Sequence, residues 1–178
     1  MNAQPWVLVT MCAVIIWYLS TQAGRLDRLH HRIDVAQAAL DTQLVRRAGI
    51  VAELANTEAF DLVTSVILAQ SAHDALASND IIDDERLQTE TDLTEILVAT
   101  FDEPADFPSD NPVLDNQIDE LAQVCRRLVM SHQFHTNAVT DCLNIRQQLL
   151  VRALFLAGRA PMPHVLNFRD DLPRSFVK

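Results

Sequence analysis

The chain has 178 residues, a formal net charge of −10 and only three glycines. This length fits one domain, and the absence of a dense basic patch argues against a nucleic-acid partner, because phosphate binding needs clustered basic side chains. With so few glycines and with prolines confined to residue 5, to 104–112 and to the region after 160, the composition predicts a few long helices rather than many short strands.

The N-terminal residues 1–24 carry no charged side chain. The apolar run within them approaches the roughly 20 residues that a helix needs to cross a bilayer. Trp6 lies at one end of the run, and Trp17 and Tyr18 lie near the other, where aromatic residues favour the membrane interface. A cleaved signal peptide would have basic residues before the run, and there are none. We therefore predict a single transmembrane anchor at 1–24.

Basic residues follow this segment but do not precede it. Arg25, Arg28 and Arg32 come soon after it, which by the positive-inside rule places the N-terminus outside and the rest of the chain in the cytoplasm. The three cysteines show no CxxC spacing, and unpaired thiols agree with a reducing compartment. The predicted location is therefore the cell membrane, with one pass.

Helical periodicity continues after the anchor. Apolar residues recur every three or four positions from 26 to 44. Asn56 and Thr57 could cap a second helix that ends near Ser78, or the two segments could form one very long helix; the sequence leaves this open. A further helix is predicted to start near Asp83 or Asp84, because acidic residues suit the first turn.

The last helix has the clearest start. Asn111 is a good N-cap residue and Pro112 suits the first helical position, while Gly158 is a natural terminator. The predicted fold is all-α: the transmembrane helix is followed by a cytoplasmic antiparallel bundle of three to four long helices at 25–158. An extended, proline-interrupted tail follows at 159–178. Its apolar side chains either pack on the bundle or bind a partner: Val165, Leu166, Phe168, Leu172 and Phe176.

Charge is unevenly distributed along the chain. Between residues 80 and 120 there are fourteen acidic residues and a single basic one, Arg86. This segment could supply solvated helix faces, or an acidic surface for a basic partner. The sequence does not decide between the two.

The stretch RLDRLHHRIDVAQAALDTQLVRR at 25–47 resembles the first motif of the LemA family, roughly L-x-x-L-x-x-R-V-D-x-A-x-x-x-V-D-x-Q-L-x-R-R. The polar positions that match are Arg32, Asp34, Asp41, Gln43, Arg46 and Arg47. A later stretch, HQFHTNAVTDC, resembles the second motif, R-x-F-Y-N-D-A-V-R-D-Y, through Phe134, Ala138, Val139 and Asp141. His135, Thr136, Asn137, Thr140 and Cys142 depart from it, and the middle of the chain diverges. The resemblance implies a membrane helix followed by a bundle of long helices, and no catalytic residue.

The motif's polar residues could fix the register of the bundle by hydrogen bonds between helices, or they could form a ligand site. Among other candidates, His132 and His135 have a spacing at which two side chains can share a metal. Bundle metal sites, however, draw Glu and His from several helices, with Glu-x-x-His motifs that the chain lacks. Cys125 and Cys142 lie on the apolar stripe, which indicates core residues rather than nucleophiles. Neither a GxSxG elbow nor a phosphate-binding loop is present. We predict no enzymatic activity, no cofactor and no metal.

The sequence thus favours a non-catalytic, single-pass scaffold. The predicted role is that of an accessory subunit of a larger membrane complex, with a respiratory or other energy-transducing assembly as a candidate by analogy of architecture. The alternative is a self-assembling membrane-remodelling or signalling module of LemA type. The predicted partners are the lipid bilayer and other membrane-protein subunits, with a homo-oligomer as a further option and no evident small-molecule substrate.

Overall fold

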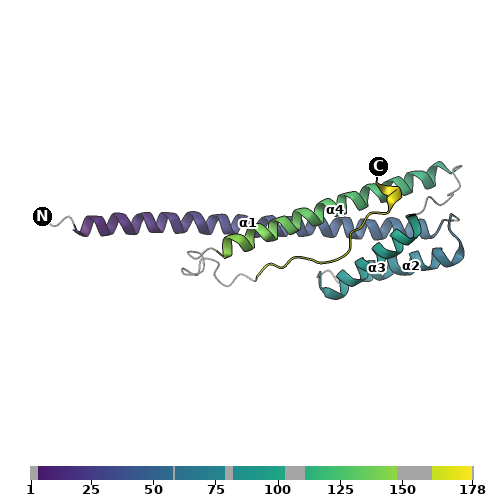
Figure 1. Ribbon diagram of the computed structural model, residues 1–178, viewed down its shortest axis with the longest axis horizontal. Helices are drawn as coiled ribbons and strands as arrows, with labels where there is room; N and C mark the ends of the chain where they lie inside the picture. The colour runs from purple at the N-terminus through teal and green to yellow at the C-terminus, as the bar shows by residue number, and fades with distance from the viewer. Residues whose placement is uncertain (1–3, 58, 79–81, 103–110, 148–161, 178) are drawn as a thin grey trace. The chain divides into compact units, whose positions relative to one another are not determined.

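The computed structural model describes residues 4–57, 59–78, 82–102, 111–147 and 162–177. They form α1 (Gln4–Ala55), α2 (Leu62–Ala77), α3 (Asp84–Phe101), α4 (Pro112–Arg146) and the short 3-10 helix η1 (Arg174–Phe176) (Figure 1). No strand occurs within these ranges. The all-α class that the sequence predicted is confirmed.

The transmembrane helix predicted at 1–24 receives no such support. Over the residues that are described, none of the helices combines the length and the apolar character that crossing a membrane requires.

The chain divides into two compact units. Unit 1 comprises Met1–Ala36 and His135–Val165, and unit 2 comprises Gln37–Phe134 and Leu166–Lys178. Both α1 and α4 therefore contribute one part to each unit.

Unit 1 has a small core of its own. Ile33 of α1 packs with Ala138, Val139 and Cys142 of α4, and Val165 packs against this cluster. In the sequence of α4, Val139 follows Ala138 directly and Cys142 comes three residues later, so the three side chains share one face of the helix.

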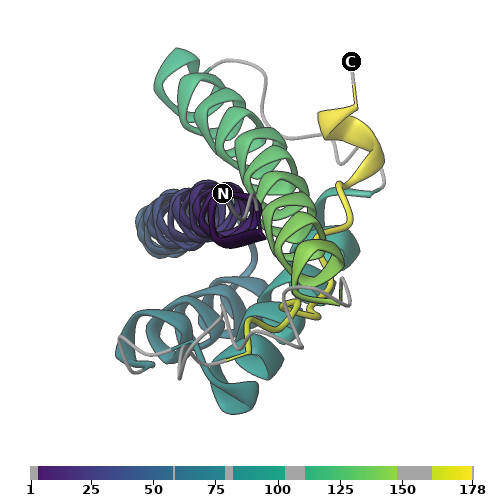
Figure 2. The same cartoon turned by 90° about the vertical axis from the view of Figure 1, so that its left-hand side faces the viewer.

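Unit 2 holds the larger core. Along α1, Leu40, Leu44, Val51 and Leu54 are each almost fully buried, and their spacing places them on one stripe of the helix. Val51 and Leu54 belong to the larger cluster, which buried side chains of α2, α3 and α4 complete, with Phe101 packed edge-on to Phe60 and tilted against Phe176. Leu40 and Leu44 pack in a second cluster with Leu87 of α3, Leu128 of α4 and Leu166. Each fully buried leucine contributes roughly 1.5–3 kcal/mol to folding. Within this unit α2 and α3 lie side by side (Figures 1 and 2).

The first long helix ends at Ala55, so the chain does not continue as one helix to Ser78. The sequence suggested Asn56 and Thr57 as caps of α2, but they do not cap it. Their side chains instead bond back to the carbonyls of Ala52 and Leu54 and close the end of α1. The N-cap of α2 is Asp61, whose carboxylate accepts from the backbone N–H groups of the second and third helical residues. The hydrogen bond from the Thr64 hydroxyl, together with these backbone bonds, lowers the pKa of Asp61.

The predicted starts of the next two helices are confirmed. Asp83 caps α3 by accepting from the N–H of Arg86. Asn111 caps α4 by accepting from the N–H groups of Val113 and Leu114, with Pro112 as the first helical residue. The described part of α4 ends at Arg146, and the predicted terminator Gly158 lies outside the described residues.

The C-terminal segment from Leu166 packs against both α3 and α4. Its extended backbone leads to η1, where Phe176 is buried. The Phe176 carbonyl accepts from Arg126 of α4, and the Ser175 hydroxyl donates to the carbonyl of Phe101 at the end of α3. Of the two alternatives for the tail's apolar side chains, the structure has the packed one: Leu166, Phe168, Leu172 and Phe176 all lie against the clusters of unit 2.

Candidate functional site

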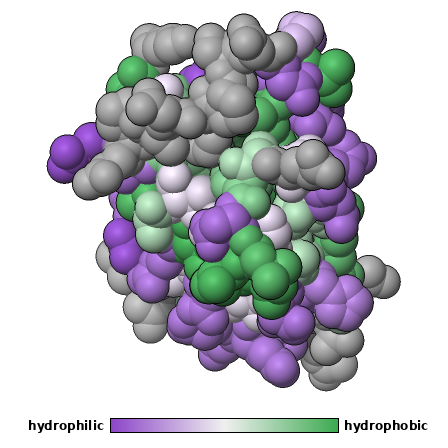
Figure 3. Space-filling model, turned by 90° about the vertical axis from the view of Figure 1, so that its right-hand side faces the viewer, coloured by the Kyte–Doolittle hydropathy of each residue, from purple (hydrophilic) through white to green (hydrophobic). Residues whose placement is uncertain are grey.

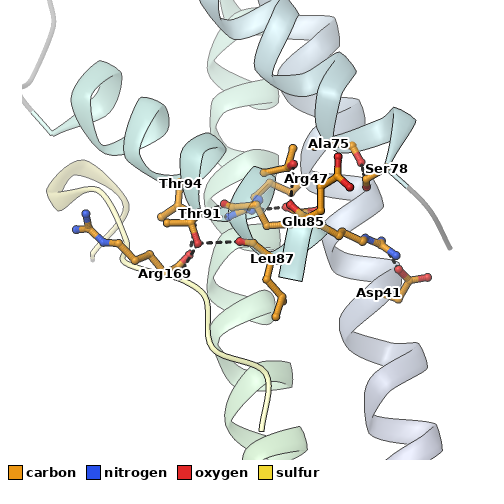
Figure 4. Close-up of polar contacts among 12 residues, drawn as sticks. Asp41, Arg47, Ala75, Ser78, Glu85, Leu87, Thr91, Thr94 and Arg169 are labelled. Atoms are coloured by element: carbon orange, nitrogen blue, oxygen red, sulfur yellow. Dashed lines mark hydrogen bonds and ion pairs between the residues drawn. The ribbon is translucent and has the colours of Figure 1, made fainter. Parts of the chain in front are cut away.

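A buried ion pair joins α1 to α3 at the centre of unit 2. The Arg47 and Glu90 side chains are only 2% and 1% exposed, and Nη2 of Arg47 lies 2.6 Å from Oε2 of Glu90. The guanidinium also donates to the Thr94 hydroxyl at 2.8 Å and to the Glu90 carbonyl at 3.1 Å. Figure 4 shows Arg47 reaching from α1 to the side of α3 that carries Thr94.

Thr94 extends the network to the C-terminal segment. Its hydroxyl lies 2.9 Å from the Glu90 carbonyl and 2.8 Å from that of Arg169, and its single hydrogen can be donated to only one of them at a time. The N–H of Arg169 in turn donates to the hydroxyl of Thr91 (Figure 4). Three segments far apart in the sequence, α1, α3 and the C-terminal segment, therefore meet at Thr94.

A second ion pair lies nearby between the same two helices. Arg86 of α3, with a side chain only 4% exposed, pairs with Asp41 of α1. The network thus uses two matching positions of the LemA-like motif, Asp41 and Arg47. A third, Gln43, has its Oε1 buried without a hydrogen-bond partner among the described residues.

This arrangement favours a structural role for the Arg47–Glu90 pair over a catalytic one. A buried guanidinium that is paired with a carboxylate and also hydrogen-bonded to neighbouring oxygens is held in one geometry. The pair lies inside the core, with both side chains almost fully buried. By linking α1 to α3 at a single geometry, the pair fixes the register of the two helices.

Both ring nitrogens of His132 on α4 form hydrogen bonds to the C-terminal segment. Nδ1 lies 2.9 Å from a carboxylate oxygen of Asp170, and Nε2 lies 2.8 Å from the carbonyl of Leu166. The ring also stacks on Phe168. Only the protonated imidazole can donate at both positions, and the hydrogen bond to Asp170, the largest influence, raises the pKa of His132.

The remaining motif positions occupy the surface or the core of unit 1. Arg32 and Asp141, one from each LemA-like stretch, lie 4.0 Å apart as an exposed ion pair. Asp34 is exposed, whereas Ala138 and Val139 are buried. Exposed pairs of this kind contribute little to stability.

In unit 2, Arg46 pairs with Glu120 at 2.6 Å on the surface. Phe134, the aromatic residue of the second motif, is 64% exposed.

The proposed anchor residues lie in the first part of α1. Trp17 is 70% exposed and Tyr18 38%, while the side chain of Trp6 lies outside the described part of the chain. Arg25 and Arg28 are exposed on the helix that follows.

Both cysteines that the structure describes are core residues, as their place on the apolar stripe predicted. Cys125 packs in the large cluster of unit 2 and Cys142 in the core of unit 1. Burial raises the pKa of each thiol, which disfavours the thiolate that a nucleophile requires. The described residues bring together no group of three His, Cys, Asp or Glu side chains that could hold a metal ion.

A groove of about 720 Å³ lies between α2 and α3. Its walls combine apolar side chains, including Val66, Ile67 and Ile96, with the carboxylates of Asp74, Asp83, Glu85 and Asp92. Figure 3 faces the end of unit 2 where α2 begins and shows apolar side chains exposed among polar ones. The large exposed apolar side chains in the first half of α2 are Leu62, Val63, Val66 and Ile67.

Comparison with known proteins returned no match: no family model, no curated protein and no solved structure is similar to this chain.

Sequence reasoning missed the α3 half of the buried network. Arg86, Glu90 and Thr94 recur every four residues and so share one face of a helix. Buried leucines at 87, 93 and 97 lie beside them. A lone arginine in an acidic segment, one helical turn from a carboxylate and flanked by leucines, was the signal that could have marked Arg86 and Glu90 as buried polar residues, although not their partners on α1.

Proposed function

We propose that this protein is a non-catalytic, membrane-anchored helical scaffold of LemA type, serving as an accessory subunit of a larger membrane assembly. The observation that carries the proposal is the exposed apolar surface of the first part of α1. Here Val7, Val9, Val14 and Ile16 are each about 60% exposed or more. Within 1–24 there is no charged side chain, and three arginines follow.

Burying such a helix in lipid would remove a large apolar surface from water. Its aromatic residues Trp17 and Tyr18 would lie beside the arginines at the interface. The rest of the chain supplies packed helices whose buried polar groups are used to join helices, which supports a scaffold rather than an enzyme.

The membrane role is tested by paired charge substitutions. The variant Val14→Asp/Ile16→Asp places two carboxylates within the apolar segment, where each costs roughly 2.5–3.5 kcal/mol in a bilayer. Val35→Asp/Val45→Asp, on exposed apolar positions of the same helix, is the matched control. We expect the first variant to be extracted by alkaline carbonate and the control to stay with the membrane pellet. Equal extraction of wild type and both variants would refute the anchor.

The accessory role is tested by mild detergent extraction and affinity purification. Recovery with stoichiometric, unrelated membrane subunits supports it. Recovery as a self-assembled species alone would favour the second LemA-type alternative, a self-assembling membrane-remodelling or signalling module. The orientation is tested with Asn116→Cys, an exposed position on α4: labelling by an impermeant maleimide only after cell disruption supports a cytoplasmic bundle.

A further inference from the structure

The helical pair α2–α3 leaves one shared face uncovered within unit 2. The groove on this face is lined from α2 by Val66, Ile67 and Asp74, and from α3 by Glu85, Asp92 and Ile96. Of these six side chains, all but Ile96 are exposed, whereas Ser71 and Arg86, which also line the groove, are buried. Two helices packed side by side, with an open groove between them, form a surface on which a third helix can pack.

The groove has two chemically different ends. Because α2 and α3 are consecutive helices joined by a short connection, the end of α2 lies beside the start of α3. That end carries the carboxylates of Asp74, Asp83 and Glu85, whereas Val66, Ile67 and Ile96 gather toward the other end.

The groove wall carries a net negative charge. Four carboxylates and one guanidinium line it: Asp74, Asp83, Glu85 and Asp92 against Arg86. Asp74 and Asp92 accept hydrogen bonds from the neutral amides of Gln70 and Gln88, and Arg86 pairs with Asp41 of α1. A cationic partner would therefore meet an excess of carboxylates beside an apolar surface.

We propose that this groove binds an amphipathic helix of a partner protein, with arginine or lysine side chains at the acidic end and branched aliphatic side chains at the apolar end. A small molecule fits the groove less well, because ligand pockets usually enclose most of the ligand's surface and this wall is largely solvent-exposed. The charges would set the orientation of the partner helix and speed its encounter, while apolar burial would supply most of the affinity.

This inference deepens the proposed scaffold role by giving the chemistry of its partner. It rests on that role only in assuming a protein partner. Membrane association and peptide binding are measured separately, so loss of the anchor in the carbonate test would leave the groove proposal standing, and failure of the groove would leave the anchor standing.

The test uses the full chain in a non-ionic detergent and fluorescently labelled 18-residue helical peptides. The first peptide carries leucine and isoleucine on one face of its first half and arginine on the same face of its second half. A second peptide distributes the same residues evenly, and a third has glutamate in place of arginine. We expect the first peptide to bind at least tenfold more tightly than either of the others by fluorescence anisotropy. Binding of the first peptide should increase the protection of backbone amides from hydrogen exchange in 62–77 and 84–101.

Two matched variants locate the binding. Asp74→Asn/Glu85→Gln/Asp92→Asn removes three groove charges and should weaken binding about tenfold, since each exposed ion pair is worth roughly 0.5 kcal/mol. Asp84→Asn/Asp115→Asn/Asp119→Asn changes net charge equally at exposed positions outside the groove wall and should change binding less than twofold.

For the apolar end, Val66→Ser/Ile67→Ser should weaken binding at least tenfold, while Met130→Ser/Phe134→Ser, on exposed apolar side chains of α4, should not. Equal effects of groove and control variants would overturn the proposal. The proposal would also be overturned if the wild-type chain self-associates and the groove variants do not, since a second copy would then be the occupant.

Discussion

Replacing Glu90 by glutamine tests the buried ion pair most directly. The substitution keeps the size and the carbonyl oxygen of the side chain but removes the negative charge that faces Arg47, which is itself 2% exposed. Breaking a buried pair from one side typically costs about 3–5 kcal/mol, because the remaining charge stays desolvated without compensation. Against a total stability of roughly 5–15 kcal/mol, this is a large fraction.

The measurement is unfolding of the full chain, followed by circular dichroism in urea and on heating. For a chain of this size the expected cost corresponds to a fall in melting temperature of about 6–20 °C. Glu95→Gln is the matched control, because Glu95 lies on the same helix in an exposed pair with Arg169, and its loss should cost less than about 1 kcal/mol.

The double variant Arg47→Met/Glu90→Leu separates pairing from packing. It removes both charges together, so it should recover most of the stability lost in Glu90→Gln. The reasoning is refuted if Glu90→Gln and Glu95→Gln destabilise the protein equally, or if the double variant is less stable than Glu90→Gln.

Four further outcomes are expected. Gly49 lies inside α1 with open space where a Cβ would be, so Gly49→Ala should raise the free energy of unfolding by roughly 0.5–1 kcal/mol. Asn111→Ala should lower it by about 1 kcal/mol through loss of the α4 cap, while Asn111→Asp should retain stability. Because the folded-state pKa of His132 is raised, its pairing stabilises the protein fully below about pH 6.5 and loses effect as pH rises through the folded value. Urea midpoints should therefore separate wild type from Asp170→Asn at pH 6 and converge at pH 9; a separation that does not change with pH would contradict this. The Cys125 thiol, buried and with a raised pKa, should react with maleimide only in urea, as read by peptide mass mapping; rapid labelling of the native chain would contradict its burial.

The helical class and the main helix starts could be predicted because they depend on local chemistry. Asp83 and Asn111 cap the helices that follow them through their own side chains, so short sequence windows contain the whole interaction. The cap of α2 was misplaced for a related reason. Asn56 and Thr57 have the right side chains, but in the structure they bond backward to α1, and a sequence pattern does not distinguish the two directions.

The partners of the polar motif residues could not be predicted. Nothing local to residues 41–47 indicates that Arg47 pairs with Glu90 or Asp41 with Arg86, about 45 positions away. The same is true of the C-terminal tail. Its apolar residues predicted packing on the bundle or on a partner, but only the folded chain shows that Phe176 packs on Phe101.

The sequence by itself determined the acidic balance, the helical class, the cap positions of α3 and α4, and the uncharged N-terminal segment, because each follows from composition or from neighbours along the chain. The tertiary structure decided which helix faces meet, where the charges of α3 are compensated, and which face of α2 and α3 is left open. Those outcomes depend on contacts between residues distant in sequence, whose energies arise only when the helices have packed and excluded water.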